Sequence, residues 1–229
     1  MSRGQENFVK LPALAAGFYD GFVCMDVFKR QNEDIAHDLL SGLTEGVLLD
    51  IGCGPGWLLK EVHTLNPHIE LFGLDISAAM CARAGKNLAG IPVDLQCSDI
   101  RATNYADDHF DVITCCGSFF MWDNPAECFE EIYRILKPGR KAMLFDPHSD
   151  VDEQQVKSSM KKSLQDETTL RRWLITYSLT HQLNMTYSQD EVEAILQQTS
   201  FADSFTVEPT SLASIPIWLR IKLRKPTED

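Results

Sequence analysis

The stretch from Val47 to Gly56, with the sequence VLLDIGCGPG, constrains the fold more than any other part of the 229-residue chain. Its apolar first half predicts a buried strand of a parallel sheet. The alternating glycines that follow predict a tight loop that a ligand can approach closely, because no Cβ atom intervenes. Residues 57–65 have a helical pattern, and the N-terminus of such a helix offers unpaired N–H groups and a partial positive charge. The stretch therefore predicts a strand–loop–helix nucleotide site.

The glycine spacing distinguishes between classes of nucleotide. A dinucleotide-binding fold needs G-x-G-x-x-G/A, in which the last small residue lets the helix pack on the strand. Trp57 stands at that position and is far too large, which argues against an NAD-dependent oxidoreductase. The pattern is instead D-x-G-x-G-x-G, and it begins with Asp50 at the end of the strand.

Strand and helix patterns alternate through the rest of the chain. Short links between alternating strands and helices indicate a parallel sheet with helices packed on it. A capping-box pattern at Ser188 and Glu191 marks the start of a later helix. Strands are expected at 69–74, 93–97, 110–116, 141–146, 205–207 and 215–223, and helices at 35–43, 57–65, 78–88, 125–136 and 188–196.

Acidic residues follow two of these strands. Asp75 ends the second strand, across the expected crevice from the glycine loop, where its two oxygens can accept both hydroxyls of a ribose. Asp99 and Ile100 follow the third strand and suit an adenine, the acid for its amino group and the apolar side chain for its ring. Met80, on the helix after Asp75, could form the other face of an adenine pocket. The structural alternatives are a turn or N-cap role for Asp75 and a core position for Met80.

In this order and spacing, these features resemble the successive motifs of class I S-adenosylmethionine-dependent methyltransferases. The resemblance includes Phe110-Asp111-Val112 and the segment 132–139 and covers about residues 46–146. It implies a doubly wound, mostly parallel seven-stranded α/β sheet with helices on both faces and an antiparallel last strand. It also implies S-adenosylmethionine as cofactor, S-adenosylhomocysteine as product and a small-molecule acceptor, as in the quinone-biosynthesis branch. Arg140 departs from the family pattern, which usually has a second glycine there.

The resemblance assigns a role to each residue at a matching position. The glycine loop would approach the methionine part of the cofactor, and Asp50 would hold its ammonium group directly or through water. Asp75 would bind the ribose. The full set of implied cofactor-binding residues is Asp50, Gly52, Cys53, Gly54, Gly56, Asp75, Ile76, Met80, Asp99, Ile100 and, through its carbonyl group, Cys115.

The acceptor side is predicted less specifically. Within one domain spanning residues 1–229, we expect an N-terminal helical cap over 1–45 and a helical lid insert over 149–186. An aromatic run follows the fourth strand, beyond whose carboxyl end ligands bind in open α/β sheets. His148, just after the fifth strand, is the candidate general base, since histidine titrates near neutrality; an exposed loop histidine is the alternative. Candidates for substrate contact are Tyr19, Phe119, Trp122 and Tyr177.

Composition limits the partners. The net charge of −12 argues against nucleic acid, whose phosphate backbone needs a basic face. The sequence has no signal-peptide pattern and no apolar run long enough for a membrane span, which predicts a cytoplasmic protein. Seven scattered cysteines without a C-x-x-C pair fit reduced thiols better than disulfides or a metal site.

Other functions on the same fold stay open. An aminopropyl transferase would use decarboxylated S-adenosylmethionine but would need acidic residues after the fourth strand, where Cys115 and Cys116 stand. A non-catalytic scaffold that retains the cofactor would have the same motifs. The motif Asn/Asp-Pro-Pro-Tyr is missing after that strand, which argues against methylation of nucleobase or glutamine amino groups.

Overall fold

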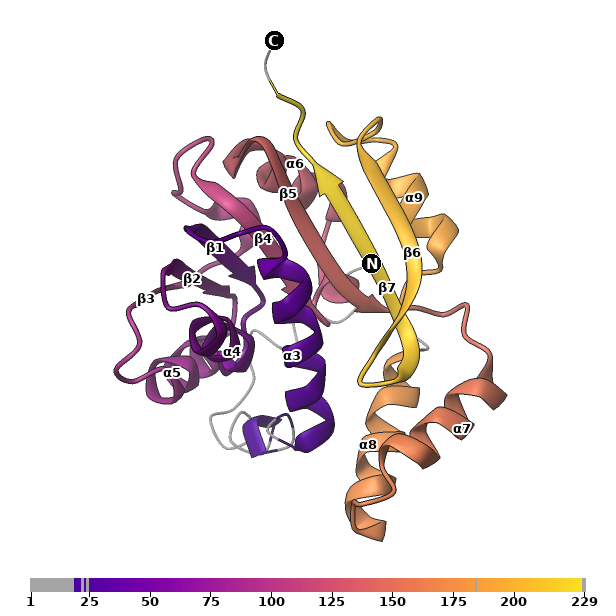
Figure 1. Cartoon of the computed structure of the whole chain (residues 1–229). Helices are drawn as coiled ribbons and strands as arrows, with labels where there is room; N and C mark the ends of the chain where they lie inside the picture. The colour runs from indigo at the N-terminus through magenta and orange to yellow at the C-terminus, as the bar shows by residue number, and fades with distance from the viewer. Residues whose placement is uncertain (1–18, 22, 24, 184, 228–229) are drawn as a thin grey trace.

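The structure, a computed structural model, describes residues 19–227 except 22, 24 and 184 (Figure 1). Its strands form one seven-stranded sheet in the order β3-β2-β1-β4-β5-β7-β6 within these residues. Neighbouring strands are parallel except that β7 is antiparallel to both β5 and β6. The predicted doubly wound sheet is confirmed. The strands are β1 (Gly46–Ile51), β2 (Ile69–Asp75), β3 (Val93–Cys97), β4 (Phe110–Cys116), β5 (Leu136–Pro147), β6 (Phe205–Leu212) and β7 (Ile215–Arg224).

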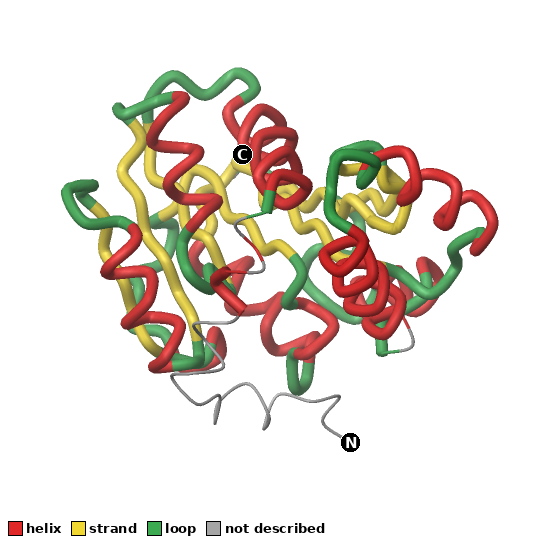
Figure 2. The backbone as a smooth tube through the Cα atoms, turned by 90° about the horizontal axis from the view of Figure 1, so that it is seen from below, coloured by secondary structure: helices red, strands yellow, loops and turns green. Residues whose placement is uncertain are grey.

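Helices cover both faces of this sheet (Figure 2). Side chains of α3, α4, α5 and α7 join one hydrophobic cluster, and those of α6 and α9 join the other. The α-helices are α3 (Asp26–Leu40), α4 (Trp57–Leu65), α5 (Ala78–Asn87), α6 (Pro125–Ile135), α7 (Glu153–Ser163), α8 (Thr169–Leu183) and α9 (Gln189–Leu196), and the short 3₁₀ helices are η1 (Ile100–Ala102) and η2 (Phe119–Met121).

Burial on both faces explains the continuous apolar run of β1. Leu48 belongs to the cluster under α3 and α4, whereas its neighbour Leu49 belongs to the cluster under α6. Both side chains are fully buried. Successive residues of a strand point to opposite faces, so a strand covered on both sides needs apolar residues throughout.

The strand order fixes where a ligand can bind. β1 lies between β2 and β4, and the chain crosses to opposite sides of the sheet after these strands. A crevice forms at such a switch point, beyond the carboxyl ends of the strands. The glycine loop, Asp75 and the loop after β4 all lie at that edge.

Strand β5 is longer than the sequence pattern predicts. It begins at Leu136, which pairs with Phe110, so residues 137–140 form an irregular part of the strand ahead of the stretch expected at 141–146. Gly139 has φ +74°, a conformation that glycine adopts without strain, and this accommodates the shift in register. Asp111 fixes the segment because its Oδ2 accepts a 2.7 Å hydrogen bond from Lys137 Nζ.

The helices α9 and α5 begin in different ways. Ser188 and Glu191 form the expected capping box at the start of α9. Ser77 does not cap α5: its hydroxyl is buried and has no hydrogen-bond partner among the described residues. The carboxylate of Asp75 instead accepts the backbone N–H of Ser77, which fixes the turn before the helix.

The helical segment predicted over residues 149–186 is present as the helices α7 and α8, which project beyond the end of the sheet (Figure 1). Their role as a lid stays a prediction, as does the N-terminal cap, of which residues 1–18 lie outside the described part. Among the described residues, no helix combines the length and apolarity needed to cross a bilayer.

Candidate functional site

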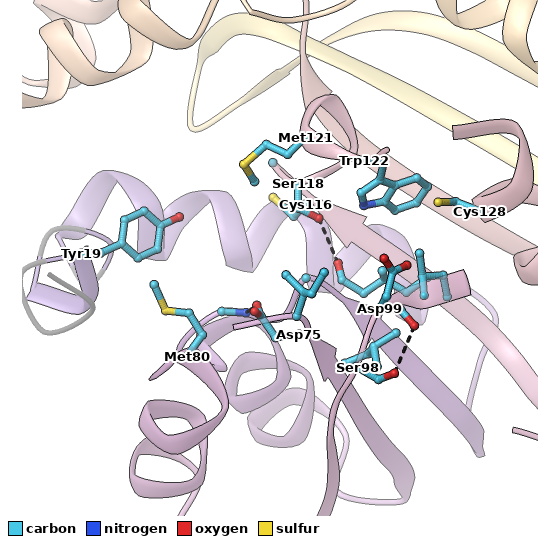
Figure 3. A pocket seen from close by; sticks show the side chains of 17 residues that line it. Tyr19, Asp75, Met80, Ser98, Asp99, Cys116, Ser118, Met121, Trp122 and Cys128 are labelled. Carbon is cyan, nitrogen blue, oxygen red and sulfur yellow. Dashed lines mark hydrogen bonds between the residues drawn. The ribbon is translucent and has the colours of Figure 1, made fainter. Parts of the chain in front are cut away.

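Two adjoining cavities of about 770 and 810 Å³ lie at the carboxyl ends of β1, β2 and β4. We call them the first cavity, shown in Figure 3, and the second cavity. The two cavities meet, because both are lined by Tyr19, Gly52, Gly54, Cys116 and Gly117.

The shared glycines leave room for a ligand against the main chain. Gly54 and Gly117 have φ of +52° and +66°, and a Cβ atom added to either would meet nothing within 4 Å. Gly52 also has a positive φ, and a Cβ there would collide with Ser118. The glycines therefore allow a left-handed loop and, at two positions, open a space that a cofactor can fill.

Two residues of the predicted cofactor set lie elsewhere. Gly56 is the residue before α4, and a Cβ on it would lie 2.8 Å from Leu88, so its small size serves the packing of α5. Cys115 is fully buried, with its Sγ atom 3.0 Å from Ser118 Oγ. Neither lines a cavity, whereas the next residue, Cys116, lines both.

Asp75 lies in the wall of the first cavity, with both carboxylate oxygens held by the main chain. Its Oδ2 accepts a 2.8 Å hydrogen bond from the N–H of Gly54, and its Oδ1 accepts one of 2.8 Å from Ser77. Each oxygen keeps a lone pair for a ligand hydroxyl. Burial raises the pKa of Asp75, and the two N–H donors partly offset that rise. The geometry suits recognition of a diol.

The opposite end of the first cavity contains Asp99 and Ile100, as the sequence predicted. Arg101 donates to both carboxylate oxygens of Asp99, at 3.2 Å from Nε and 2.8 Å from Nη2. Ile100 is buried, and Ile76 and Met80 also line this cavity. A fixed acceptor beside apolar side chains suits a flat base with an exocyclic amino group.

Asp50 lines the second cavity and is almost completely buried. Burial raises its pKa well above the usual value, and the negative charge of Asp75 adds to the rise. Within the described residues, its carboxyl group forms no ion pair. A cationic ligand group in the second cavity would stabilise the ionised carboxylate, which is the role predicted for Asp50. Cys53, also predicted, lines the same cavity.

Tyr19 is held over the junction of the cavities by its neighbour Asp20. Oδ1 of Asp20 accepts hydrogen bonds from Trp57 Nε1 at 2.8 Å and from Asn87 Nδ2 at 3.1 Å. Nε of Arg83 lies 3.4 Å from the other oxygen. Burial raises the pKa of Tyr19 to about 12, so its phenol stays neutral. The segment before α3 is thus fastened to α4 and α5.

The other predicted substrate residues are separated in space. Trp122 lines the first cavity. Phe119 is buried and packs against Trp122 and Tyr187 without reaching a cavity. Tyr177 is exposed on α8, where it stacks on Trp173, and it lines neither cavity.

His148 is buried beyond the end of β5 and lines neither cavity. Its Nδ1 atom has no hydrogen-bond partner in the described structure. Burial lowers the pKa of His148, and Asp150 opposes that effect, so the neutral imidazole is favoured at neutral pH. The general-base role of His148 stays a prediction.

Asp146, which the sequence reading did not single out, positions one wall of the first cavity. It is fully buried at the end of β5 and accepts the N–H groups of Phe119 at 2.9 Å and Phe120 at 3.3 Å. These bonds anchor η2, which carries Met121 and precedes Trp122, both lining residues. Burial raises the pKa of Asp146 to about 8.

The outer wall of the second cavity was also missed. Phe28 and Gln31 come from α3, and Trp218 comes from β7, nearly at the other end of the chain. No local motif links these segments, because only the folded sheet brings them together. The apolar spacing of α3 was visible in the sequence, but it does not tell which polar residue turns towards a ligand.

Comparison with known proteins places the fold and the glycine loop in one family. Residues 49–144 match the family model described as a methyltransferase domain. The uncharacterized methyltransferase YdaC of Bacillus subtilis is 27% identical over 128 residues, which are 55% of this chain and 71% of that protein. The ubiquinone/menaquinone biosynthesis C-methyltransferase UbiE of Desulfotalea psychrophila is 31% identical over 101 residues, 44% of this chain and less than half (41%) of that protein.

A solved structure matches nearly the whole chain. It is that of a putative S-adenosyl-L-methionine-dependent methyltransferase from Methanococcus maripaludis, with a TM-score of 0.70 and 22% sequence identity. The match covers 96% of each chain. At this identity the likeness shows a shared fold, including the segments outside the family match.

Proposed function

The chain belongs to the class I S-adenosylmethionine-dependent methyltransferases, and on that premise we propose that it methylates a small, partly apolar molecule bound in the second cavity. The observation that carries the proposal is the junction of the two cavities at Tyr19, Gly54 and Cys116. A cofactor with its nucleoside in the first cavity would cross this junction, so that its ammonium group reaches Asp50 at the near side of the second cavity and leaves the side of Phe28, Gln31 and Trp218 to the acceptor. An acceptor in the second cavity then lies beside the group to be transferred.

The residues present fit S-adenosylmethionine, which supplies an activated methyl group. Asp75 would accept hydrogen bonds from the ribose hydroxyls, and Asp99 with Ile100 would hold the adenine. Asp50 would pair with the ammonium group. The main chain at Gly54 supports this arrangement, because the space beside it would be filled by a Cβ atom in any other residue.

The second cavity has the character of a site for a ring with an oxygen substituent. Phe28 and Trp218 give it an apolar wall. Trp218 Nε1 and Gln31 Nε2 are buried donors without a partner among the described residues. An unsatisfied buried donor costs about 1–3 kcal/mol, so an acceptor oxygen that receives such a donor gains affinity. The quinone-biosynthesis C-methyltransferase among the relatives supports the same class of acceptor.

Methyl transfer requires mainly alignment and exclusion of water. Well-oriented reacting pairs reach effective molarities of about 10⁵–10⁸ M. The side chains at the junction suit this task because they are uncharged: burial raises the pKa of both Tyr19 and Cys116. The thiol of Cys116 therefore stays protonated and does not compete with the acceptor for the methyl group.

A general base is needed only where the acceptor must lose a proton. His148 is the residue proposed for that task, and its favoured neutral form can accept a proton. Because His148 lines neither cavity, it would take the proton of the acceptor through a bridging water, or directly if the acceptor extends as far as His148. The acidic chain supports a small molecule rather than nucleic acid as acceptor.

A ligand panel followed by a product assay tests the proposal. Thermal unfolding is measured with S-adenosylmethionine, S-adenosylhomocysteine, decarboxylated S-adenosylmethionine and NADH. A ligand at about a hundred times its Kd adds about 2.7 kcal/mol, which raises the midpoint by roughly 5–10 °C at this size. We expect shifts with the first two compounds.

Label from methyl-tritiated S-adenosylmethionine is then followed into a panel of quinols, phenols and carboxylic acids. Transfer to a quinol or phenol is the expected result. A cofactor-induced shift without transfer to any compound would favour the non-catalytic scaffold. A shift with decarboxylated cofactor alone would favour the aminopropyl transferase.

A further inference from the structure

Three of the five exposed large hydrophobic side chains among the described residues lie on α8, the second helix of the α7–α8 hairpin. Leu170, Trp173 and Tyr177 on α8 are 67%, 59% and 57% exposed. The next large hydrophobic side chains in the described residues, Leu65 and Met185, are 39% and 37% exposed. Large exposed apolar side chains that gather on one element mark an interaction surface, whereas scattered ones are ordinary.

These three side chains form one stripe along α8. Their spacing of three and then four residues places them on the same side of a helix. Ile175 points to the opposite side and is fully buried in the core. Trp173 and Tyr177 stack, with ring centroids 5.6 Å apart. The stripe is therefore turned away from the side on which α8 packs against the protein.

The tip of the hairpin is basic in an otherwise acidic chain. Residues 153–172, from the start of α7 to the first turn of α8, contain five basic and three acidic residues, a formal charge of +2, whereas the whole chain carries −12. Lys161 and Lys162 lie in the last turn of α7 and Arg171 lies near the start of α8, so they share one end of the hairpin (Figure 1). Arg171 is 3.6 Å from Glu167, but Lys161 and Lys162 form no ion pair within the described residues.

We propose that this hairpin docks on the surface of an anionic lipid bilayer. The stripe of Leu170, Trp173 and Tyr177 would enter the interfacial region, where amphipathic aromatic rings are favoured. Lys161 and Lys162 would lie against the anionic head groups, which attract basic side chains near the bilayer surface. Basic residues beside exposed aromatic and aliphatic ones are typical of helices that lie in a bilayer interface.

Charge complementarity favours a bilayer over a second copy of this chain. In a two-fold dimer through the stripe, the same surface patch of both copies would meet. The basic tips of the two copies would then either repel one another or reach the acidic part of the partner only at the edge of the dimer interface. An anionic bilayer satisfies the whole tip at once and accepts the apolar stripe in the same plane.

The hairpin is joined to the second cavity through α3. Arg30 of α3 donates a 3.0 Å hydrogen bond to the carbonyl group of Ser163, at the end of α7. The hydroxyl of Ser163 donates to the carbonyl group of Ala213 at 3.1 Å, between β6 and β7. Docking would hold the mouth of the second cavity beside the bilayer, which suits an apolar acceptor. This last step rests on the proposed function, whereas the docking itself does not.

Co-sedimentation of the full chain with lipid vesicles tests the docking without any activity assay. Vesicles of phosphatidylcholine with phosphatidylglycerol are compared with vesicles of phosphatidylcholine alone. We expect binding to the anionic vesicles only, and at least a tenfold loss of apparent affinity in the double variant Trp173→Ser/Tyr177→Ser. A loss of similar size is expected in Lys161→Glu/Lys162→Glu and at high salt, because the head-group attraction is screened.

Matched controls separate the hairpin from general stickiness. Leu65→Ser removes an exposed apolar side chain on α4, and Lys86→Glu reverses an exposed charge on α5. Both should bind anionic vesicles as the unchanged chain does, and thermal unfolding of every variant checks that it folds. No binding to anionic vesicles, or binding that the hairpin variants leave intact, overturns the proposal. A concentration-dependent dimer lost in the Trp173 variant, without vesicle binding, would assign the stripe to self-association.

Discussion

The two cavities share a border but are built in different ways. The first cavity uses loops that directly follow β1, β2 and β3, and its central carboxylate, Asp75, is held by the main-chain N–H groups of Gly54 and Ser77. The second cavity takes its outer wall from α3 and β7, whose side chains Gln31 and Trp218 keep unpartnered donors among the described residues. The carboxylate of Asp75 in the first cavity thus has hydrogen-bond partners in the protein itself, whereas the donors of Gln31 and Trp218 in the second cavity have none among the described residues.

This contrast teaches how one fold can keep a cofactor and change its acceptor. Main-chain groups at a switch point follow from the topology, so substitutions seldom alter them. Side chains on a helix and a distant strand can be replaced without moving the loop. Substitutions should therefore divide into those that abolish cofactor binding and those that alter only the acceptor.

The largest effect is expected from Gly54→Ala. The new Cβ atom enters open space in the protein, so the unliganded fold loses only about 1–2 kcal/mol for a left-handed alanine. If the cofactor fills that space, its affinity should fall by about a hundredfold or more, measured by calorimetry with S-adenosylhomocysteine. Gly90→Ala is the matched control, since Gly90 has φ +89° and equally open surroundings but lines neither cavity. Equal affinities in the two variants would show that nothing approaches Gly54.

A smaller loss is expected from Asp75→Asn. The amide keeps one oxygen acceptor but replaces the other with an N–H donor, which opposes the main-chain N–H that Asp75 accepted there and removes an acceptor for a ribose hydroxyl. A charged hydrogen bond contributes about 1.5–3 kcal/mol, so the Kd for S-adenosylhomocysteine should rise by roughly 10–100-fold. Glu70→Gln, on the exposed side of the same strand, should leave the Kd unchanged. Retained affinity in Asp75→Asn would remove the diol assignment.

The acceptor side should respond to Gln31→Leu, which keeps the volume and removes the unpartnered donor. We expect the KM for the methylated acceptor to rise about tenfold, equivalent to about 1.4 kcal/mol, with the Kd for S-adenosylhomocysteine unchanged. Glu33→Gln, elsewhere on α3, is the control. A change in cofactor affinity instead would place the cofactor, and not the acceptor, against Gln31 and would break the division between the cavities.

The smallest effect concerns Asp146 and pH. Its pKa is raised to about 8 in the folded protein, above the value of about 3.9 for an exposed aspartate. The folded state therefore holds a proton that the unfolded state has released, and this contribution to stability is lost as pH rises from about 4 through about 8. In Asp146→Asn the melting temperature should depend less on pH over that interval. An unchanged pH profile would show that Asp146 is ionised throughout.

The residues whose position at the cavities could be predicted were those that local order places at the sheet edge. A glycine loop after a buried strand and an acid after the next strand lie at one sheet edge because parallel strands end together, and Asp50, Gly54, Asp75 and Asp99 line the cavities accordingly. Gly56 fits the same pattern but serves the packing of α5, since sequence cannot tell which neighbour occupies the space beside a glycine.

The rest depends on contacts between distant segments. Gln31 and Trp218 are separated by most of the chain and meet only after the sheet has closed with β7 between β5 and β6. The contribution of Asp146 could not be predicted, because its carboxyl group binds the main chain of η2 and no sequence motif marks such a contact. For residues 149–186 the sequence predicts a helical segment that contains Tyr177. It does not predict that Tyr177 lies on the exposed side of its helix.

The five residues common to both cavities have a consequence for how such a protein can change over time. If the cofactor and the acceptor meet at this border as proposed, a substitution at Tyr19, Gly52, Gly54, Cys116 or Gly117 would change the binding of both ligands at once. Residues such as Phe28, Gln31 and Trp218 carry no such double constraint. Libraries aimed at a new acceptor should vary these outer positions first and leave the common border intact.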